Sequence, residues 1–329
     1  MTDKTDPMPG RCALIVGVSG QDGTYLSKLL LEKGYEVHGT SRDAEVASFG
    51  NLKSLHVRDR VSVHSAVAID FRSIFQVISR TRPDEIYNLS GQSSVGLSFQ
   101  QPVETMESII IGTLNILEVI RLLGRPVRFY NAGSGECFGD TGGKAANETM
   151  AFHPRSPYAV AKAAAFWEVA NYREAYDLFA CSGILFNHES PLRPERFVTR
   201  KIIAAAARIA GGDREKLFLG DLSIQRDWGW APEYIEAMWL IIQQEIADDY
   251  VIATGEPDSL EEFVNIAFAH FGLAWRDHVE IDEKLYRPAD IACGFGDASK
   301  AAELLGWRAE TRMPAVVTRM AKAEALRQK

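Results

Sequence analysis

The sequence predicts an α/β fold: a doubly wound parallel sheet with a smaller, mainly C-terminal α/β lobe. Three observations predict this fold. Short apolar runs alternate with helical stretches up to about residue 190, a glycine-rich turn follows the first apolar run, and the alternation stops beyond that point. At 329 residues the chain is longer than a typical single domain, which leaves room for the second lobe.

The first half of the chain reads as strand, glycine-rich turn, helix and strand, repeated. We expect a strand over 12–20, a helix over 24–34 with Gly34 at its end, and a strand over 35–41. The expected elements that follow are strands at 61–65, 85–90, 127–134 and 179–187, and helices at 71–83, 104–123 and from Pro157 onward. Strands separated by such helices form a parallel Rossmann-like sheet and bind ligands at their carboxyl ends.

The second half follows a different pattern. Residues 187–201 resemble a loop, and the expected elements after residue 190 are helices at 198–211, 232–245 and 259–271 and short strands at 216–219 and 250–253. We therefore divide the chain into a flexible tail (1–10), a dinucleotide-binding Rossmann domain (11–190) and a predominantly substrate-binding lobe (191–329). The chain can cross back from this lobe to complete the sheet.

The composition excludes several classes of protein. A formal charge of −8 argues against a general nucleic-acid binder, and no apolar run reaches the 18–20 residues of a membrane span. The cysteines are not arranged as CxxC pairs, so we expect no metal site, reduced thiols and a cytoplasmic location. They are Cys12, Cys137, Cys181 and Cys293.

The turn "GVSGQDG" predicts a cofactor site. Gly17, Gly20 and Gly23 have GxxGxxG spacing between a strand and a helix. Glycines let the backbone approach a pyrophosphate, and the helix amino terminus supplies N–H donors to it. The spacing alone also fits an ordinary tight turn, but the flanking strand and helix favour dinucleotide binding.

The end of the second strand bears on which dinucleotide is bound. NAD sites of this type carry an acidic residue there, whereas this strand ends in "GTSRD" with Arg42. A guanidinium pairs well with a ribose 2′-phosphate, so Arg42 favours NADP. Asp43 follows directly and weakens the inference, so NAD stays open.

The stretch "SPYAVAK" places Tyr158 and Lys162 four residues apart at the start of a predicted helix. Residues i and i+4 share one helix face, so the ammonium is expected to lower the pKa of the phenol by favouring phenolate. Such a tyrosine can act as a base near neutral pH. A lone YxxxK is often a surface pair, but here it follows a glycine-rich βαβ unit.

Together the glycine spacing, "NLSGQSSV", Ser134 and Tyr158-x-x-x-Lys162 resemble the extended short-chain dehydrogenases/reductases that modify nucleotide sugars. The longer phrases "GQDGTYL", "PRSPYAVAK", "GILFNHESPLR" and "QRDWGWAPEYIEAMW" closely resemble the GDP-mannose 4,6-dehydratase family, and similar blocks span residues 12 to about 310.

The resemblance implies an internal redox cycle. Hydride leaves C4 of the hexose for NADP⁺, water is eliminated across C5 and C6, and the hydride returns to C6. It also implies roles for four residues: Tyr158 takes the C4 hydroxyl proton, Lys162 holds the cofactor ribose, Ser134 hydrogen-bonds the C4 oxygen, and Glu136 moves protons at C5 and C6.

The resemblance further implies binding residues. Those expected to contact the cofactor are Gly17, Gly20, Gln21, Asp22, Gly23, Arg42, Leu89, Ser90, Gln92, Lys162, His188 and Arg193. Those expected to contact the GDP-sugar are Ser93, Asn187, Val198, Lys201, Arg226, Arg287 and Asp290. The alternative interpretation of each basic residue is a solvated surface charge. The alternative interpretation of His188 is a core histidine with satisfied hydrogen bonds.

Three alternatives remain. A reductase or epimerase of this fold needs Tyr158 and Lys162 but no proton-abstracting glutamate. A GDP-manno-heptose dehydratase runs the same reaction on a longer sugar, and a non-catalytic NADP sensor typically lacks the tyrosine or the lysine. The family forms homodimers or homotetramers, and the sequence does not distinguish them.

Overall fold

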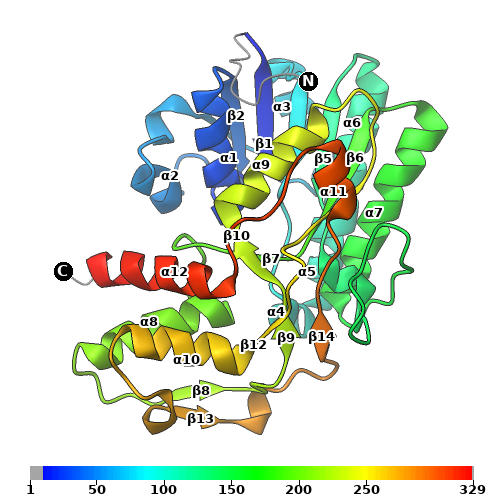
Figure 1. The fold of residues 1–329 in the computed structure, drawn as a ribbon. Helices are drawn as coiled ribbons and strands as arrows, with labels where there is room; N and C mark the ends of the chain where they lie inside the picture. Colours follow the sequence, from blue (N-terminus) through cyan, green and yellow to red (C-terminus); the bar gives the residue numbers. More distant parts are fainter. Residues whose placement is uncertain (1–9, 328–329) are drawn as a thin grey trace.

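The computed structural model describes residues 10–327 and contains a seven-stranded, wholly parallel sheet (Figure 1). The strand order is β11-β6-β5-β4-β1-β2-β3, which reverses beside β1 as in doubly wound folds. The strands are β1 (Cys12–Val16), β2 (Glu36–Ser41), β3 (Ser62–Ser65), β4 (Glu85–Asn88), β5 (Arg128–Ala132), β6 (Ala180–Leu185) and β11 (Tyr250–Ile252). The predicted fold class is confirmed.

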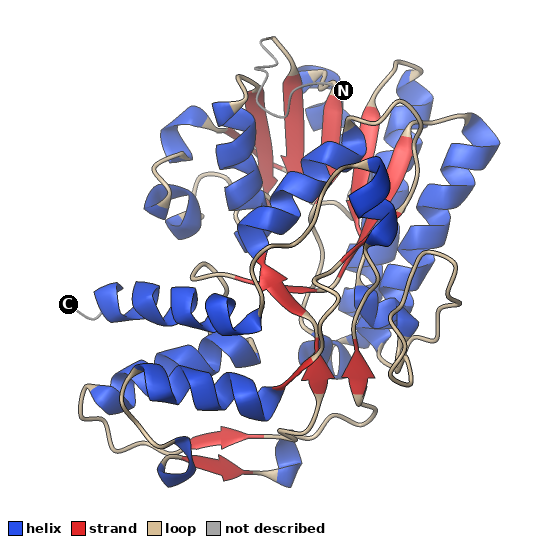
Figure 2. Cartoon of the chain, in the orientation of Figure 1, coloured by secondary structure: helices blue, strands red, loops and turns tan. Residues whose placement is uncertain are grey.

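Helices cover both faces of this sheet (Figure 2). On one face α1 (Gln21–Glu32) and α9 (Ala231–Ile242) lie side by side, and the other face carries α3 (Phe71–Thr81), α6 (Gly112–Leu123) and α7 (Pro157–Tyr176). Side chains alternate along β1 because successive residues of a strand point to opposite faces. Ala13 and Ile15 therefore join one core, and Leu14 and Val16 join the other.

The expected helix at 104–123 is longer and less regular than predicted. It begins with α5 (Pro102–Met106), passes through a π-helical turn (Glu107–Ile111) and continues as α6. Four helices were not predicted: α2 (Gly50–Ser54), α4 (Val95–Gln100), α11 (Ser299–Leu304) and α12 (Met313–Arg327). The 3₁₀ turns of the described chain are Arg58–Arg60, Gly135–Phe138, Trp275–Asp277 and Glu283–Leu285.

A second lobe packs around its own apolar core. Its helices are α8 (Val198–Ala210), α10 (Leu260–His270) and α12 (Met313–Arg327), and α11 (Ser299–Leu304) lies against β11. The short paired strands are β7 (Asn187–Glu189) with β10 (Trp228–Trp230), β8 (Leu217–Leu219) with β13 (Val279–Ile281), and β9 (Gln225–Arg226) between β12 (Asp258–Ser259) and β14 (Cys293–Gly294).

The chain passes between the two lobes more than once. After α8 and β8 it returns to place α9 on the main sheet and to add β11 to its edge beside β6. The segment after residue 190 thus contributes to both lobes. Of the proposed tail, residues 1–9 lie outside the described residues. Within 10–327, no helix is both long enough and apolar enough to span a membrane.

Candidate active site

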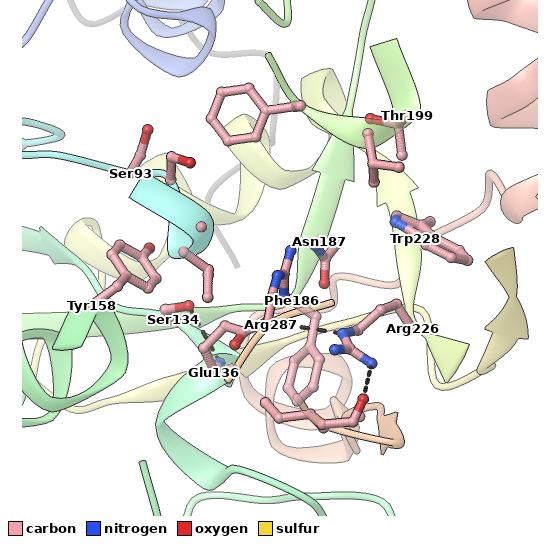
Figure 3. Close-up of a pocket in the computed structure, with 18 of the residues that line it drawn as sticks. Ser93, Ser134, Glu136, Tyr158, Phe186, Asn187, Thr199, Arg226, Trp228 and Arg287 are labelled. Atoms are coloured by element: carbon pink, nitrogen blue, oxygen red, sulfur yellow. Dashed lines mark hydrogen bonds and ion pairs between the residues drawn. The ribbon is translucent and has the colours of Figure 1, made fainter. Parts of the chain in front are cut away.

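A cavity of about 430 Å³ lies where the carboxyl ends of the main strands meet the second lobe. Side chains from both lobes surround it (Figure 3). The sequence-predicted residues that line it are Asp22, Leu89, Ser90, Gln92, Ser93, Ser134, Glu136, Tyr158, Lys162, Asn187, His188, Arg193, Val198, Lys201, Arg226, Arg287 and Asp290. Those outside its lining are Gly17, Gly20, Gln21, Gly23 and Arg42.

The glycine-rich turn leads from β1 into α1 and packs against the loop after β4. Gly17 has φ +94°, and a Cβ there would lie 2.9 Å from the Leu89 carbonyl oxygen. A Cβ on Gly23 would lie 2.6 Å from the Gly17 carbonyl oxygen. Gly20 is the N-cap residue of α1, and no side chain caps this end of the helix. The N–H groups at the start of α1 are therefore not capped by a side-chain acceptor. These features suit a pyrophosphate.

Behind this turn, Asp22 and His188 form an ion pair. Nε2 of His188 lies 3.0 Å from Oδ2 of Asp22, and Nδ1 of His188 lies 2.8 Å from the Phe186 carbonyl oxygen. Burial raises the pKa of Asp22, but His188 outweighs it and holds this pKa at about 2. Despite burial, Asp22 raises the pKa of His188. His188 thus has satisfied hydrogen bonds and also faces the cavity.

Gln21 ties the first turn of α1 to the segment after β7. Its amide nitrogen donates to the His188 carbonyl oxygen at 3.2 Å, and its oxygen accepts from the Ser190 hydroxyl at 2.7 Å. The predicted cofactor residue Gln21 therefore holds the glycine-rich turn in place through buried hydrogen bonds.

Arg42 directly follows β2, at the carboxyl edge of the sheet. It does not line the cavity described above. The Asp43 carboxylate accepts backbone N–H bonds from Glu45 and Val46 at 2.9 and 3.1 Å, so Asp43 shapes the local turn. The acidic group after Arg42 is thus engaged within its own loop.

The loop after β4 fixes its own conformation. The Gln92 amide nitrogen donates to the Ser94 carbonyl oxygen at 2.8 Å and to the Thr105 hydroxyl at 3.1 Å. The Ser90 hydroxyl donates to Oδ1 of Asn88 at 2.7 Å. Gln92 therefore holds the loop that lines the cavity.

Tyr158 and Lys162 lie in the first two turns of α7. Ser156 caps this helix by accepting from the Ala159 N–H at 3.1 Å, and Pro157 fits the first helical position. Both site residues are buried and face the cavity, with Nζ of Lys162 lying 5.9 Å from the Tyr158 ring centre. The helix therefore presents both groups to the same cavity.

The expected lowering of the Tyr158 pKa is not found in the structure. Burial raises the pKa of the phenol above its usual value, and a hydrogen bond from Ser134 only partly offsets this. Lys162 donates instead to the Ala132 carbonyl oxygen at 2.7 Å, and burial lowers its own pKa to about 8. The sequence-based expectation neglected the desolvation of both groups.

Ser134 and Glu136 lie where β5 ends. Ser134 caps the 3₁₀ turn by accepting from the Glu136 N–H at 3.3 Å, which turns the glutamate toward the cavity (Figure 3). Gly135 between them packs on Phe186, whose ring lies 2.8 Å from the position a Cβ would take. The turn is thus compact enough to bring both side chains to the same cavity.

Arg226 crosses from the second lobe to Glu136. Its Nε lies 3.8 Å from Oε1 of Glu136, and its terminal nitrogens contact Oδ1 of Asp290 at 2.9 Å and the Ile291 carbonyl oxygen at 2.7 Å. Arg287 lies 3.4 Å from the same Asp290 oxygen. Two guanidinium groups and two carboxylates therefore form one network in the cavity wall.

Sequence reasoning missed some of the residues that line the cavity. Glu189 is buried there, accepts from the Thr199 hydroxyl at 2.6 Å and lies 3.4 Å from Nε of Arg193. No local pattern marks Thr199, because its partner lies on another element. Further lining residues that were missed are Phe186, Arg196, Phe197, Phe218 and Trp228.

A tyrosine and a lysine one helical turn apart, facing a cavity at the carboxyl edge of a doubly wound sheet, place the protein in the short-chain dehydrogenase/reductase class. A family model described as GDP-mannose 4,6 dehydratase matches residues 14–320. The chain belongs to this family.

Named relatives agree with this assignment. The chain is 48% identical to GDP-mannose 4,6 dehydratase 2 of Arabidopsis thaliana over 328 residues, covering 97% of this chain and 88% of the relative. It is 43% identical to GDP-mannose 4,6-dehydratase of Sinorhizobium fredii (strain HH103), covering 98% and 97%. It is 40% identical to GDP-mannose 4,6 dehydratase of Homo sapiens, covering 96% and 92%.

Solved structures share the fold. UDP-glucose 4-epimerase of Thermus thermophilus in complex with NAD aligns with a TM-score of 0.83 at 24% identity, covering 95% of this chain and 98% of that one. dTDP-glucose 4,6-dehydratase of Bacillus anthracis in complex with NAD has a TM-score of 0.83 at 17% identity, covering 97% of each.

Proposed function

We propose that this protein is a GDP-mannose 4,6-dehydratase that converts GDP-D-mannose to GDP-4-keto-6-deoxy-D-mannose with loss of water, using NADP. The observation that carries this proposal is the meeting of three groups around one cavity: the Tyr158–Lys162 pair, Glu136 and the basic wall around Arg226. A simple reductase needs the first group but has no use for a carboxylate beside it.

Oxidation at C4 requires that its hydroxyl lose a proton. In this proposal Tyr158 takes that proton, and the Ser134 hydroxyl, which hydrogen-bonds the phenol, holds the same C4 oxygen. Lys162, held by the Ala132 carbonyl, supplies positive charge beside the phenol. A bound nicotinamide supplies the hydride acceptor for C4 and the donor for C6.

Elimination follows from the ketone at C4, which acidifies the neighbouring C5 proton. Glu136 removes this proton and then delivers it to the departing C6 hydroxyl, which leaves as water. When hydride returns to C6, Tyr158 gives C5 the exchangeable proton that it took from the C4 hydroxyl, so the proton count closes. Arg226 holds the Glu136 carboxylate toward the cavity. One residue therefore serves as base and then as acid within a single turnover.

The residues present fit a dinucleotide with a 2′-phosphate. Gly17 and Gly23 leave no side chain over the turn, the amino terminus of α1 has no side-chain cap, and Arg42 follows β2. Arg42 supports NADP rather than NAD. The test is to measure the dissociation constants of NADP⁺ and NAD⁺ for the natural protein and for Arg42→Gln. The natural protein should bind NADP⁺ more tightly than NAD⁺, and the variant should lose this preference.

The diphosphate of a GDP-sugar needs cations inside an acidic protein. Arg226, Arg287 and Lys201 line the cavity, and Lys201 donates to the Phe218 carbonyl oxygen at 2.7 Å. A phosphate can exchange with the carboxylate and carbonyl partners of these groups. Asn187, Val198, Ser93 and Asp290 complete the proposed sugar-nucleotide pocket.

The experiment is turnover of GDP-mannose without added reductant. Formation of the 4-keto-6-deoxy product supports dehydration, whereas a demand for one NADPH per product supports a reductase of the same fold. GDP-manno-heptose, assayed in parallel, tests the second candidate function. A higher kcat/KM for GDP-manno-heptose than for GDP-mannose would make the heptose the substrate, while the proposed mechanism would stay the same.

We propose that the protein works in the cytoplasm as a homodimer or homotetramer. All four cysteines are free, which suits a reducing compartment. Exposed apolar side chains gather on the neighbouring helical segments from α5 to α7, and such patches mark protein contacts. The residues are Val103, Ile111, Val160, Trp167 and Tyr176. Sedimentation equilibrium measures the state.

A further inference from the structure

A cluster of metal-binding side-chain types lies at the opposite edge of the main sheet from the cavity. Cys12 begins β1 and Glu36 begins β2, and the two are register partners in the parallel ladder. His38 follows on the same face of β2, because alternate residues of a strand share a face. The parallel register therefore gathers a thiol, a carboxylate and an imidazole at the amino-terminal edge of the sheet.

The three groups are close enough to share one ion. The Cys12 sulfur, a Glu36 carboxylate oxygen and a His38 ring nitrogen all lie within 4.8 Å of one another. Cys12 and His38 are half-buried, and the Glu36 side chain is 70% exposed, so an ion can enter from solvent. Thiolate, imidazole and carboxylate are the ligands of Zn²⁺ sites that keep a fourth position open. We propose that Cys12, Glu36 and His38 bind one Zn²⁺ ion.

The surroundings favour a cation. The Cys12 thiol contacts the Thr81 carbonyl oxygen at 3.5 Å, at the end of α3 where the helix dipole is negative. The Asp84 carboxylate accepts from the Cys12 N–H at 2.8 Å. Burial first, then Glu36 and Asp84, raise the pKa of this thiol to about 11, while Arg125 opposes them. The carboxylates of Glu36 and Asp84 disfavour a free thiolate at Cys12, but the same negative charges attract a divalent cation.

A second histidine orients the first. Nδ1 of His38 lies 3.0 Å from Nε2 of His64, and Nδ1 of His64 lies 2.9 Å from a nitrogen of Arg80. Arginine only donates, so neutral His64 accepts at Nδ1 and donates from Nε2 to His38. His38 then carries its proton on Nε2 and donates it to Glu36 at 3.0 Å. This tautomer follows from the donors available.

Zinc replaces the proton between His38 and Glu36. The His38 proton moves to Nδ1 and the His64 proton to its own Nδ1, so each imidazole keeps one proton and His38 donates to His64. The Cys12 thiol loses the single proton that is released. His64 then no longer accepts from Arg80, an exposed side chain that must turn away. Arg80 therefore opposes metal binding, which gives the proposal a distinctive prediction.

Titration of the metal-free full-length protein with Co²⁺, followed by absorption, tests the proposal. The expected result is one Co²⁺ per chain with a thiolate charge-transfer band that Zn²⁺ abolishes. Cys12→Ser loses the band, Glu36→Gln weakens binding at least tenfold, and Arg80→Gln strengthens it severalfold. Cys293→Ser is the matched control, because Cys293 is also a half-buried cysteine near a strand end, and it keeps the band.

The proposal is overturned if Cys12→Ser and Glu36→Gln bind Co²⁺ with the affinity and spectrum of the unchanged protein, or if the unchanged protein shows no thiolate band. Glu36 is largely exposed, so its replacement leaves the fold intact even where a Cys12 variant is unstable. The site lies at the opposite edge from the cavity, so the outcome does not depend on the sugar chemistry.

Discussion

Nε of Arg226 lies 3.8 Å from Oε1 of Glu136, while a second nitrogen of the same guanidinium lies 2.9 Å from Oδ1 of Asp290. One buried cation thus joins the carboxylate proposed to move the C5 proton to a carboxylate proposed to contact the nucleotide sugar. The guanidinium contacts both carboxylates. Substitutions at Glu136 and at Asp290 can therefore distinguish the proposed proton transfer from the proposed binding of the nucleotide sugar.

Glu136→Gln is expected to lower kcat for dehydration by about 10²–10⁴-fold, because the amide cannot accept the C5 proton. Binding of NADP⁺, measured by isothermal titration calorimetry, should be unchanged. Asp290→Asn is the matched control: it removes the other acidic contact of Arg226 and should raise KM while keeping most of kcat. Equal loss of turnover and NADP⁺ binding in Glu136→Gln would mean that Glu136 is structural.

The phenol of Tyr158 should ionise more easily when NADP⁺ is bound. Burial raises its pKa, and a positive nicotinamide ring beside it would bring the charge that favours phenolate. We expect the pKa to fall by at least about one unit, equivalent to about 1.4 kcal/mol. The difference between ultraviolet titrations of the protein and of Tyr158→Phe, each with and without NADP⁺, measures this. An unchanged Tyr158 pKa would contradict the proposal that bound NADP⁺ makes the phenol ionise more easily.

The Asp22–His188 pair should make stability depend on pH. Folding lowers the Asp22 pKa from 3.8 to about 2 and raises the His188 pKa above 6.5. The pair therefore contributes its full stabilisation between pH 3.8 and pH 6.5, which are the ordinary pKa values of the two groups. Its contribution is lost as pH falls toward 2, where the carboxylate is protonated, or rises through the raised His188 pKa, where the imidazolium is neutralised.

Asp22→Asn tests this pair. The variant should lose on the order of 2 kcal/mol of unfolding free energy near about pH 5, and less above about pH 8. Urea unfolding at the two pH values measures the loss. The NMR titration of the His188 ring should show a lower pKa in the variant. An identical His188 titration would show that the carboxylate does not set its charge.

Two glycines of the same turn should respond differently to alanine. A Cβ on Gly23 would lie 2.6 Å from the Gly17 carbonyl oxygen and 2.7 Å from Val18 Cα, so backbone must move. Gly23→Ala should destabilise the free protein by roughly 1–3 kcal/mol. A Cβ on Gly20 would meet only the Gly17 oxygen at 3.7 Å, so Gly20→Ala should keep its stability and lose affinity for NADP⁺. Thermal unfolding and calorimetry distinguish the two effects.

Much of the main sheet was predictable because its strands are short apolar runs with polar or glycine-rich ends, as in "CALIV" and "ACSGIL". The strands β9, β12 and β14 were not. Each has two residues and exists only through pairing with a distant part of the chain. A strand near 250–253 and a return of the chain to the sheet were among the expectations, but the place of β11 beside β6 depends on long-range packing.

The site divides in the same way. Ser134, Glu136, Tyr158 and Lys162 follow local signals, a strand end and a helix start, and the structure brings them to one cavity. The contact of Arg226 with Glu136 joins segments far apart in sequence, so no spacing indicates it. The raised pKa of the tyrosine was missed for a different reason, because burial is a property of the folded chain.

The most direct measurement of the proposed chemistry is the fate of deuterium placed at C4 of GDP-mannose. If Tyr158, Lys162 and Glu136 act around one retained cofactor, the 4-keto-6-deoxy product formed in H₂O should carry the deuterium at C6. Unlabelled GDP-mannose turned over in D₂O should give deuterium at C5 and none at C6, and neither reaction should consume NADPH. Mass spectrometry and NMR of the product measure both positions. From the C4-labelled sugar, a product without deuterium at C6, or one formed only with stoichiometric NADPH, would contradict the account.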